Sequence, residues 1–136
     1  MSEEQPAPFE ALDFIYMPSR DTAADLRRFS MQLGARAVFA IEAFDSRVAM
    51  VELSDGPPAI LLADHLEGEQ PVLVFRVADL DGAVAELERR GARPGSRFGI
   101  PHGPICSLEL QGGQRIAIYE RTRPQADDHL RGRMDF

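Results

Sequence analysis

The side chains that most often perform chemistry are sparse in this sequence of 136 residues. Its three histidines, His65, His102 and His129, share neither the spacing of a helix face nor that of a strand, so they do not predict a metal site. His102 lies between a proline and a glycine and is the histidine best placed to contact a ligand from a loop. As a general base it would need an orienting partner, which the sequence does not identify. The absence of lysine excludes Schiff-base chemistry on that residue.

The one cysteine, Cys106, lies in an apolar run from Ile105 to Leu108. A single cysteine cannot form an intrachain disulfide or the cysteine cluster of a structural zinc site. An apolar setting raises the pKa of a thiol, which disfavours the reactive thiolate. We therefore predict that Cys106 is a small buried core residue rather than a nucleophile.

The charge balance excludes several classes of partner. Fifteen basic and 22 acidic residues give a net charge of −7, and no basic run offers a surface for nucleic-acid phosphates. No apolar stretch approaches the roughly 20 residues needed to span a membrane. Residues 1–8 are acidic and contain proline, unlike the basic and then apolar start of a secretory signal. We expect a bacterial protein located in the cytoplasm, with no nucleic-acid or membrane partner.

An internal repeat organises the chain. Each half starts with a short apolar run, followed by an aspartate that can cap a helix, an amphipathic helical pattern, and a glycine suited to a left-handed C-cap. The halves match at an offset of 58 residues through the aspartate and at 57 from the glycine onward. The matching features are the runs 14–17 and 72–75, Asp21 and Asp79, and Gly34 and Gly91.

Three further strands follow the helix in each half, because runs of apolar and β-branched residues are separated by turn residues. The expected strands are 37–43, 47–53 and 59–63 in the first half and 93–98, 106–110 and 115–120 in the second, with turns at 44–46, 54–57 and 111–114.

Each half is therefore a βαβββ module of about 50 residues, too small to bury its own sheet face. We predict an α+β fold in which two modules pair into a half-barrel with a concave ligand-binding hollow, within one chain or between two. The single domain 1–136 would comprise module one at about 10–65, a linker at 66–71, module two at about 72–122, and a tail at 123–136 that wraps the surface or frays.

Three stretches carry a resemblance to a known family: the strand, turn and helix from Val72 to Gly91, the loop Gly99-Ile100-Pro101-His102-Gly103, and the turn Gly113-Gln114-Arg115-Ile116. They resemble the vicinal oxygen chelate superfamily, which includes glyoxalase I, bleomycin-resistance proteins and extradiol dioxygenases. The resemblance extends over residues 12 to about 122. It departs from the family pattern at 111–113, where Gln-Gly-Gly replaces the usual Asp-Pro-Asp-Gly turn.

The resemblance implies a divalent metal held by His, Gln or Glu from the first and last strands of each module. The matching positions here are Phe14, Val72, Leu61 (or Ile60, if the register shifts by one) and Ala117. None of these side chains offers an oxygen or nitrogen ligand. We therefore expect no metal and no other cofactor.

Strand alternation predicts which side chains face the hollow, because residues two apart share a face. On the third strand of each module, Met50 and Ser107 should point into the hollow. The alternate residues should face the helices: Ala49, Val51, Leu53, Cys106, Leu108 and Leu110. Alternatively, Glu52 and Glu109 pair with Arg76 and Arg115 as cross-strand salt bridges, and the aromatic residues are ordinary core. The predicted ligand-binding residues are Phe14, Tyr16, Glu52, Leu61, Val72, Val74, Arg76, His102, Glu109, Arg115, Ala117 and Tyr119.

Three functions fit these features. The first is a metal-free binding protein, resembling the bleomycin-resistance branch, that sequesters an amphipathic or cationic organic ligand without chemistry. The second is a lyase, isomerase or dioxygenase that uses displaced metal ligands or acid–base residues such as Tyr16, Glu109 or His102. The third is a structural or regulatory module without a small ligand, in which large side chains fill the hollow. The first is our main expectation, which makes the chain a binding protein rather than an enzyme, and its relatives suggest a homodimer.

Overall fold

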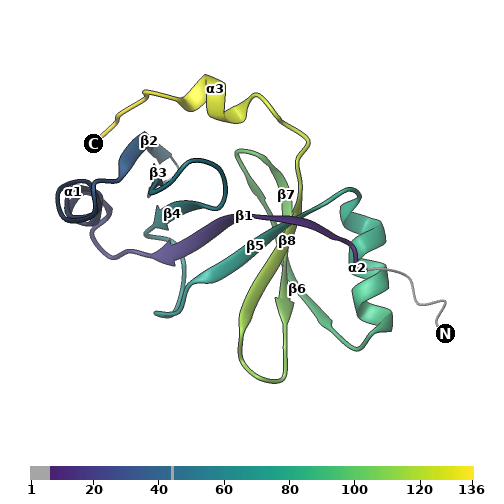
Figure 1. The fold of residues 1–136 in the computed structure, drawn as a ribbon. Coiled ribbons are helices and arrows are strands. Elements are labelled where there is room, and N and C mark those ends of the chain that lie inside the picture. The colour runs from purple at the N-terminus through teal and green to yellow at the C-terminus, as the bar shows by residue number, and fades with distance from the viewer. Residues whose placement is uncertain (1–6, 44) are drawn as a thin grey trace.

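The structure is a computed structural model that describes residues 7–43 and 45–136. Its strands form one eight-stranded sheet in the order β2-β3-β4-β1-β5-β8-β7-β6, with α1 and α2 at its two ends (Figure 1). The elements are β1 Phe9–Pro18, α1 Thr22–Leu33, β2 Arg36–Ala43, β3 Ser46–Glu52, β4 Ala59–Ala63, β5 Val72–Val77, α2 Leu80–Arg89, β6 Arg93–Ile100, β7 Gly103–Glu109, β8 Arg115–Glu120 and α3 Ala126–Leu130.

The two βαβββ modules pair within one chain. Their first strands, β1 and β5, run antiparallel at the centre of the sheet, and each also pairs in parallel with the last strand of its own module, β4 or β8. The sheet therefore continues from one module into the other without an edge between them. This arrangement confirms the predicted α+β fold with a half-barrel sheet.

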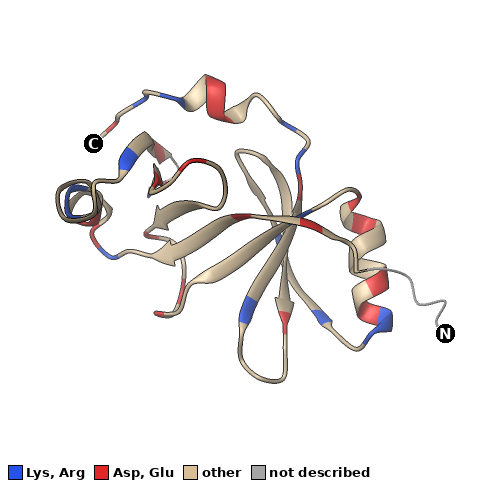
Figure 2. Ribbon diagram, in the orientation of Figure 1, with Lys and Arg blue, Asp and Glu red and all other residues tan. Residues whose placement is uncertain are grey.

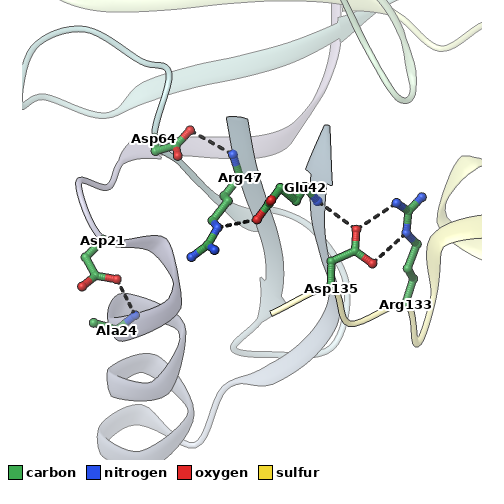
Figure 3. A network of polar contacts seen from close by, with 7 residues as sticks. All are labelled: Asp21, Ala24, Glu42, Arg47, Asp64, Arg133 and Asp135. Atoms are coloured by element: carbon green, nitrogen blue, oxygen red, sulfur yellow. Dashed lines mark hydrogen bonds and ion pairs between the residues drawn. The ribbon is translucent and has the colours of Figure 1, made fainter. Parts of the chain in front are cut away.

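Both helices begin where the sequence predicts, but only one uses its aspartate as a cap. Asp21 accepts a hydrogen bond from the backbone N–H of Ala24 at 3.1 Å (Figure 3), and Gly34 ends α1 in the left-handed conformation. Asp79 makes no side-chain capping bond. Instead, the backbone N–H of Leu80 donates to the carboxylate of Glu120 at 2.9 Å. A side chain from β8 therefore pairs one of the free N–H groups in the first turn of α2.

The predicted division of the sheet into two faces is largely confirmed. Cys106, Leu108 and Ile118 are buried under α2, and Ala49 and Val51 are buried under α1. Met50 joins the buried cluster on the concave face, and Ser107 also lies on that face.

The prediction is wrong for two residues at the ends of strands. Leu53 and Leu110 were expected under the helices, but they are 49% and 36% exposed. Each lies one residue beyond the end of its strand, where the alternation of faces stops applying.

The connection between β6 and β7 is shorter than the sequence predicts. Both strands extend toward one another, which leaves a turn of Pro101 and His102 only. His102 lies in this turn and is buried, rather than displayed in a loop. In the first module, Phe44 of the predicted turn 44–46 lies outside the described residues, and β3 already begins at Ser46.

The tail, residues 123–136, wraps across the top of the sheet from β8 to the edge strand β2 (Figure 1). The backbone N–H of Gly132 donates to the carbonyl of Val38, and that of Ala40 donates to the carbonyl of Arg133 at 2.8 Å. Asp135 accepts from the backbone N–H of Glu42 and from the guanidinium of Arg133 (Figure 3). The tail therefore covers a sheet edge that would otherwise expose unpaired backbone groups.

Charged residues are spread over the helices, the connections and the strands, where many of them lie near the strand ends (Figure 2). No helix of the described part of the chain is long and apolar enough to cross a membrane.

Candidate functional site

A pocket of about 900 Å³ opens on the concave face over the second module. Its floor comes from β5 and β8, one wall from β6 and β7, and another part from residues 65–67 before β5. Apolar side chains dominate the lining, with a few polar groups among them, as in most small-molecule sites. The lining includes Tyr16, His65, Glu67, Val72, Val74, Phe98, Ser107, Glu109, Arg115 and Ala117.

The concave face over the first module is filled. Phe14, Phe39 and Met50 are buried there in one cluster. Leu130, from the short helix α3, packs against the same cluster. The two modules are related in sequence, but Leu130 fills the hollow only over the first of them, so the hollow is asymmetric and open over the second.

The pocket contains half of the twelve predicted ligand-binding residues: Tyr16, Val72, Val74, Glu109, Arg115 and Ala117. Phe14, Leu61, His102 and Tyr119 are buried in the packed part of the hollow. Glu52 and Arg76 form ion pairs outside the pocket.

The alternative cross-strand salt bridges do not form. Arg76 pairs with Glu10 at 3.2 Å and with Asp13 at 3.3 Å, and Glu52 pairs with Arg36 at 3.6 Å. Arg115 instead donates to the backbone carbonyl of Gln70 at 2.7 Å. Strand alternation does not predict these partners, because the neighbouring strand β1 and the linker supply closer acceptors to Arg76 and Arg115 than the cross-strand glutamates do.

Tyr16 is the most unusual polar group of the pocket. Its side chain is buried and lines the pocket from β1, and its hydroxyl has no hydrogen-bond partner in the described part of the chain. Burial raises the pKa of Tyr16 well above its ordinary value of 10, so the phenol is neutral at physiological pH. Tyr16 therefore offers an unused hydrogen-bond donor inside an apolar pocket.

His102 does have an orienting partner, and it comes from the tail. Its Nε2 atom lies 2.6 Å from a carboxylate oxygen of Asp127 in α3, and its ring packs on Phe14 with centroids 4.5 Å apart. The Nδ1 atom is buried without a partner. The sequence could not reveal this pair because the two residues are 25 positions apart and no pattern predicted α3. Since His102 does not line the pocket, the pair attaches the tail to the second module.

We expect the His102–Asp127 contact to make stability depend on acid pH. The hydrogen bond from His102 holds the pKa of Asp127 below its usual value of 3.8. A lowered carboxyl pKa stabilises the folded state above pH 4, and this contribution is lost as pH falls through the folded-state pKa. Urea unfolding should show that wild type exceeds Asp127→Asn in stability at pH 6, with the gap narrowing toward pH 3. Parallel pH curves for the two proteins would contradict this expectation.

A β-bulge brings an unexpected carboxylate onto the concave face. The register of β1 against β5 shifts between Leu12 and Phe14, and the extra residue is Asp13. Asp13 is buried, accepts a hydrogen bond from the hydroxyl of Tyr119 at 2.5 Å, and pairs with Arg76. Burial and this hydrogen bond raise the pKa of Tyr119. An acidic residue within an apolar strand is the sequence feature that could have indicated a special role for Asp13. Strict alternation, however, predicts that Asp13 faces the helices, because Phe14 faces the hollow.

Replacing Asp13 with alanine should lower the free energy of unfolding by about 1–3 kcal/mol, because the buried hydroxyl of Tyr119 would lose its acceptor. Glu10→Ala is the matched control, since it also removes a carboxylate that pairs with Arg76 but does so at an exposed site. The control should change stability by less than about 1 kcal/mol. Chemical denaturation measures both, and equal losses would show that Asp13 acts only as a surface charge.

Comparisons with known proteins identify the fold. No protein-family model matches the sequence, and no curated protein sequence matches it. Among solved structures, methylmalonyl-CoA epimerase from Mycobacterium tuberculosis superposes with a TM-score of 0.74 at 20% identity, over 90% of this chain and 95% of that one. A Streptomyces coelicolor methylmalonyl-CoA epimerase variant in complex with 2-nitronate-propionyl-CoA gives 0.71 at 17% identity, over 84% and 96%.

The chain has the vicinal oxygen chelate fold. A third similar structure is a methylmalonyl-CoA epimerase in complex with methylmalonyl-CoA and NH4+, with a TM-score of 0.71 at 18% identity, over 84% of this chain and 96% of that one. At these identities the likeness establishes the fold alone. It agrees with the resemblance that the sequence carries.

Within the vicinal oxygen chelate fold, the four positions matched to metal ligands lie together. Val72 and Ala117 line the pocket, and Phe14 and Leu61 are buried beside it. Among residues 7–43 and 45–136, no three His, Cys, Asp or Glu side chains are grouped so that they could hold a metal ion.

Proposed function

We propose that this chain is an isomerase-type enzyme of the vicinal oxygen chelate superfamily that moves a proton at the carbon next to a carbonyl group. The observation that carries the proposal is Tyr16, a buried phenol without a partner among the described residues that faces an apolar pocket. A carbonyl oxygen placed against its hydroxyl would accept a hydrogen bond. That bond would strengthen as negative charge develops on the oxygen when the neighbouring C–H proton leaves.

The residues at the metal-ligand positions support a role for Tyr16 as the group that polarises the carbonyl. Phe14, Leu61, Val72 and Ala117 offer no ligand atoms; Val72 and Ala117 line the pocket, and Phe14 and Leu61 belong to the buried apolar cluster beside it. A divalent metal does not fit this set of side chains. In such surroundings a single neutral donor acts more strongly than in water, because the low local dielectric enlarges its effect.

The pocket also contains groups that can accept the proton. Glu67 and Glu109 provide carboxylates and His65 an imidazole, and all three line the pocket. A general base must come within hydrogen-bond reach of the proton it removes. We assign the base to this group of three residues.

The similar solved structures support the same class of reaction. Their names describe the epimerisation of methylmalonyl-CoA, a thioester whose reacting carbon lies next to a carbonyl. For this chain we infer the chemistry next to a carbonyl, but not the binding of coenzyme A. Arg115 is the only arginine that lines the pocket in the described structure, and the net charge of −7 does not attract several phosphates.

Hydrogen–deuterium exchange at the substrate carbon tests the proposal directly. Candidate carbonyl compounds, including methylmalonyl-CoA, a propionyl thioester and 3-benzoylpropionate, are incubated with the protein in D2O and followed by proton NMR. With at least one compound, we expect the NMR signal of the proton on the carbon next to the carbonyl to disappear. This loss should be faster with the protein than in buffer alone or with heat-inactivated protein. The absence of exchange for a compound that binds would refute the isomerase proposal.

The second candidate function is stoichiometric binding of an amphipathic or cationic organic ligand without chemistry. The acidic residues Glu67 and Glu109 in the pocket lining favour a cationic ligand of this kind. Calorimetry would then show binding of one ligand per pocket with no exchange. Homodimer formation and a cytoplasmic location remain predictions, and sedimentation of the purified protein would test the first.

A further inference from the structure

Arg115 and Tyr16 lie in one row across the concave face. Tyr16 pairs with Val72 in the antiparallel ladder between β1 and β5. The parallel register between Leu73 and Ile116, extended by one residue, places Val72 beside Arg115. Adjacent strands are about 4.8 Å apart, so the backbones of Tyr16 and Arg115 are separated by roughly 10 Å, with the apolar Val72 between them.

The guanidinium of Arg115 is held in place but is not neutralised. One nitrogen donates to the carbonyl of Gln70 at 2.7 Å, and the same nitrogen packs against Gly68, where an added Cβ would lie 3.1 Å from it. Glu109 is the cross-strand partner of Arg115, yet they form no ion pair, and no other described carboxylate pairs with Arg115. The linker therefore fixes one edge of the guanidinium and leaves its remaining N–H donors without a carboxylate.

We propose that Arg115 is the carboxylate-binding residue of the pocket and that the substrate is an apolar carboxylic acid that also contains a carbonyl group. The carboxylate contacts Arg115, the carbonyl oxygen contacts Tyr16, and a short hydrocarbon spacer crosses Val72. A guanidinium binds a carboxylate through parallel N–H donors, which fixes orientation as well as charge. This inference rests on the proposed function for the Tyr16 end of the substrate only.

Glu109 and Glu67 do not remove the preference of the pocket for a carboxylate. Both carboxylates are exposed, so water screens them, whereas Arg115 is partly buried and anchored by the linker. An anionic substrate would therefore meet one positioned cation and two solvated anions. Removal of an anion should strengthen the binding of an acid, and this consequence separates the proposal from the cationic-ligand alternative.

The test compares a matched pair of probes, 3-benzoylpropionate and its uncharged methyl ester, by isothermal titration calorimetry on the full chain. We expect wild type to bind the acid at least tenfold more tightly than the ester. Arg115→Gln should remove that preference while leaving ester affinity within about twofold, and Arg115→Lys should restore part of it. Glu109→Gln should keep or increase the preference. Thermal unfolding confirms that each variant folds.

Three results would overturn the proposal: equal affinities of acid and ester for wild type, a preference that survives in Arg115→Gln, or no binding of the acid at millimolar concentration. Failure of this inference is distinguishable from failure of the proposed function. If wild type exchanges the proton next to the carbonyl and Tyr16→Phe slows that exchange, while Arg115→Gln keeps the preference for the acid, then the role of Tyr16 stands and only the carboxylate site is wrong.

Discussion

Replacing Gly103 with alanine should destabilise the protein by about 3 kcal/mol or more and lower its melting temperature by roughly 10 °C. A Cβ at this position would lie 1.9 Å from the backbone carbonyl oxygen of Glu120 and 3.0 Å from the backbone nitrogen of Thr122. Neither atom belongs to a side chain that could rotate away. The backbone of Gly103 also has a φ of 154°, which strains any residue with a side chain. Thermal and urea unfolding followed by circular dichroism would measure the loss.

Gly99 provides the control for this prediction. It lies four residues earlier on β6, and an added Cβ there would meet no atom within 4 Å. Gly99→Ala should therefore leave stability unchanged within about 0.5 kcal/mol, as at most surface positions. Similar losses for the two variants would mean that β7 and β8 do not approach one another as closely as the structure describes.

Replacing Tyr16 with phenylalanine should lower the rate of proton exchange next to the substrate carbonyl by about 10²- to 10³-fold, the usual cost of removing one donor from a developing oxyanion. The apolar pocket would be retained, so ligand binding should weaken far less than the rate. Stability should not fall, because the lost hydroxyl has no hydrogen-bond partner among the described residues. Because the pKa of Tyr16 is raised by burial, ionisation of this phenol should not reduce the wild-type rate below pH 10.

The other tyrosine gives the matched control. Tyr119 is also buried, but its hydroxyl donates to Asp13 and it does not line the pocket. Tyr119→Phe should therefore cost about 1 kcal/mol of stability and leave the exchange rate within a few-fold of wild type. NMR exchange rates and denaturation curves of both variants would show this crossover. A large rate loss in Tyr119→Phe with none in Tyr16→Phe would contradict the prediction and would indicate that the substrate carbonyl lies near Tyr119.

The repeat and the alternation of the strands determined most of the fold. Asp21 and Gly34 bound a helix through interactions within a few residues, and such local interactions can be predicted from sequence. The same holds for Met50 and Cys106, whose faces follow from the two-residue period of a strand. The sequence also indicated that the inward positions of Phe14 and Leu61 are apolar.

The tertiary structure alone decided which half of the hollow stays open. The bulge at Asp13, the contact between His102 and Asp127, and the attachment of Arg115 to the linker all join segments distant in sequence, and no local pattern encodes such contacts. Leu130 packs over the first module because the tail crosses the top of the sheet. The sequence predicts one hollow formed by the two modules and does not indicate which part of it is filled. The short helix α3 packs Leu130 over the first module and contacts His102 through Asp127, whereas Tyr16 and Arg115 line the pocket that stays open over the second module.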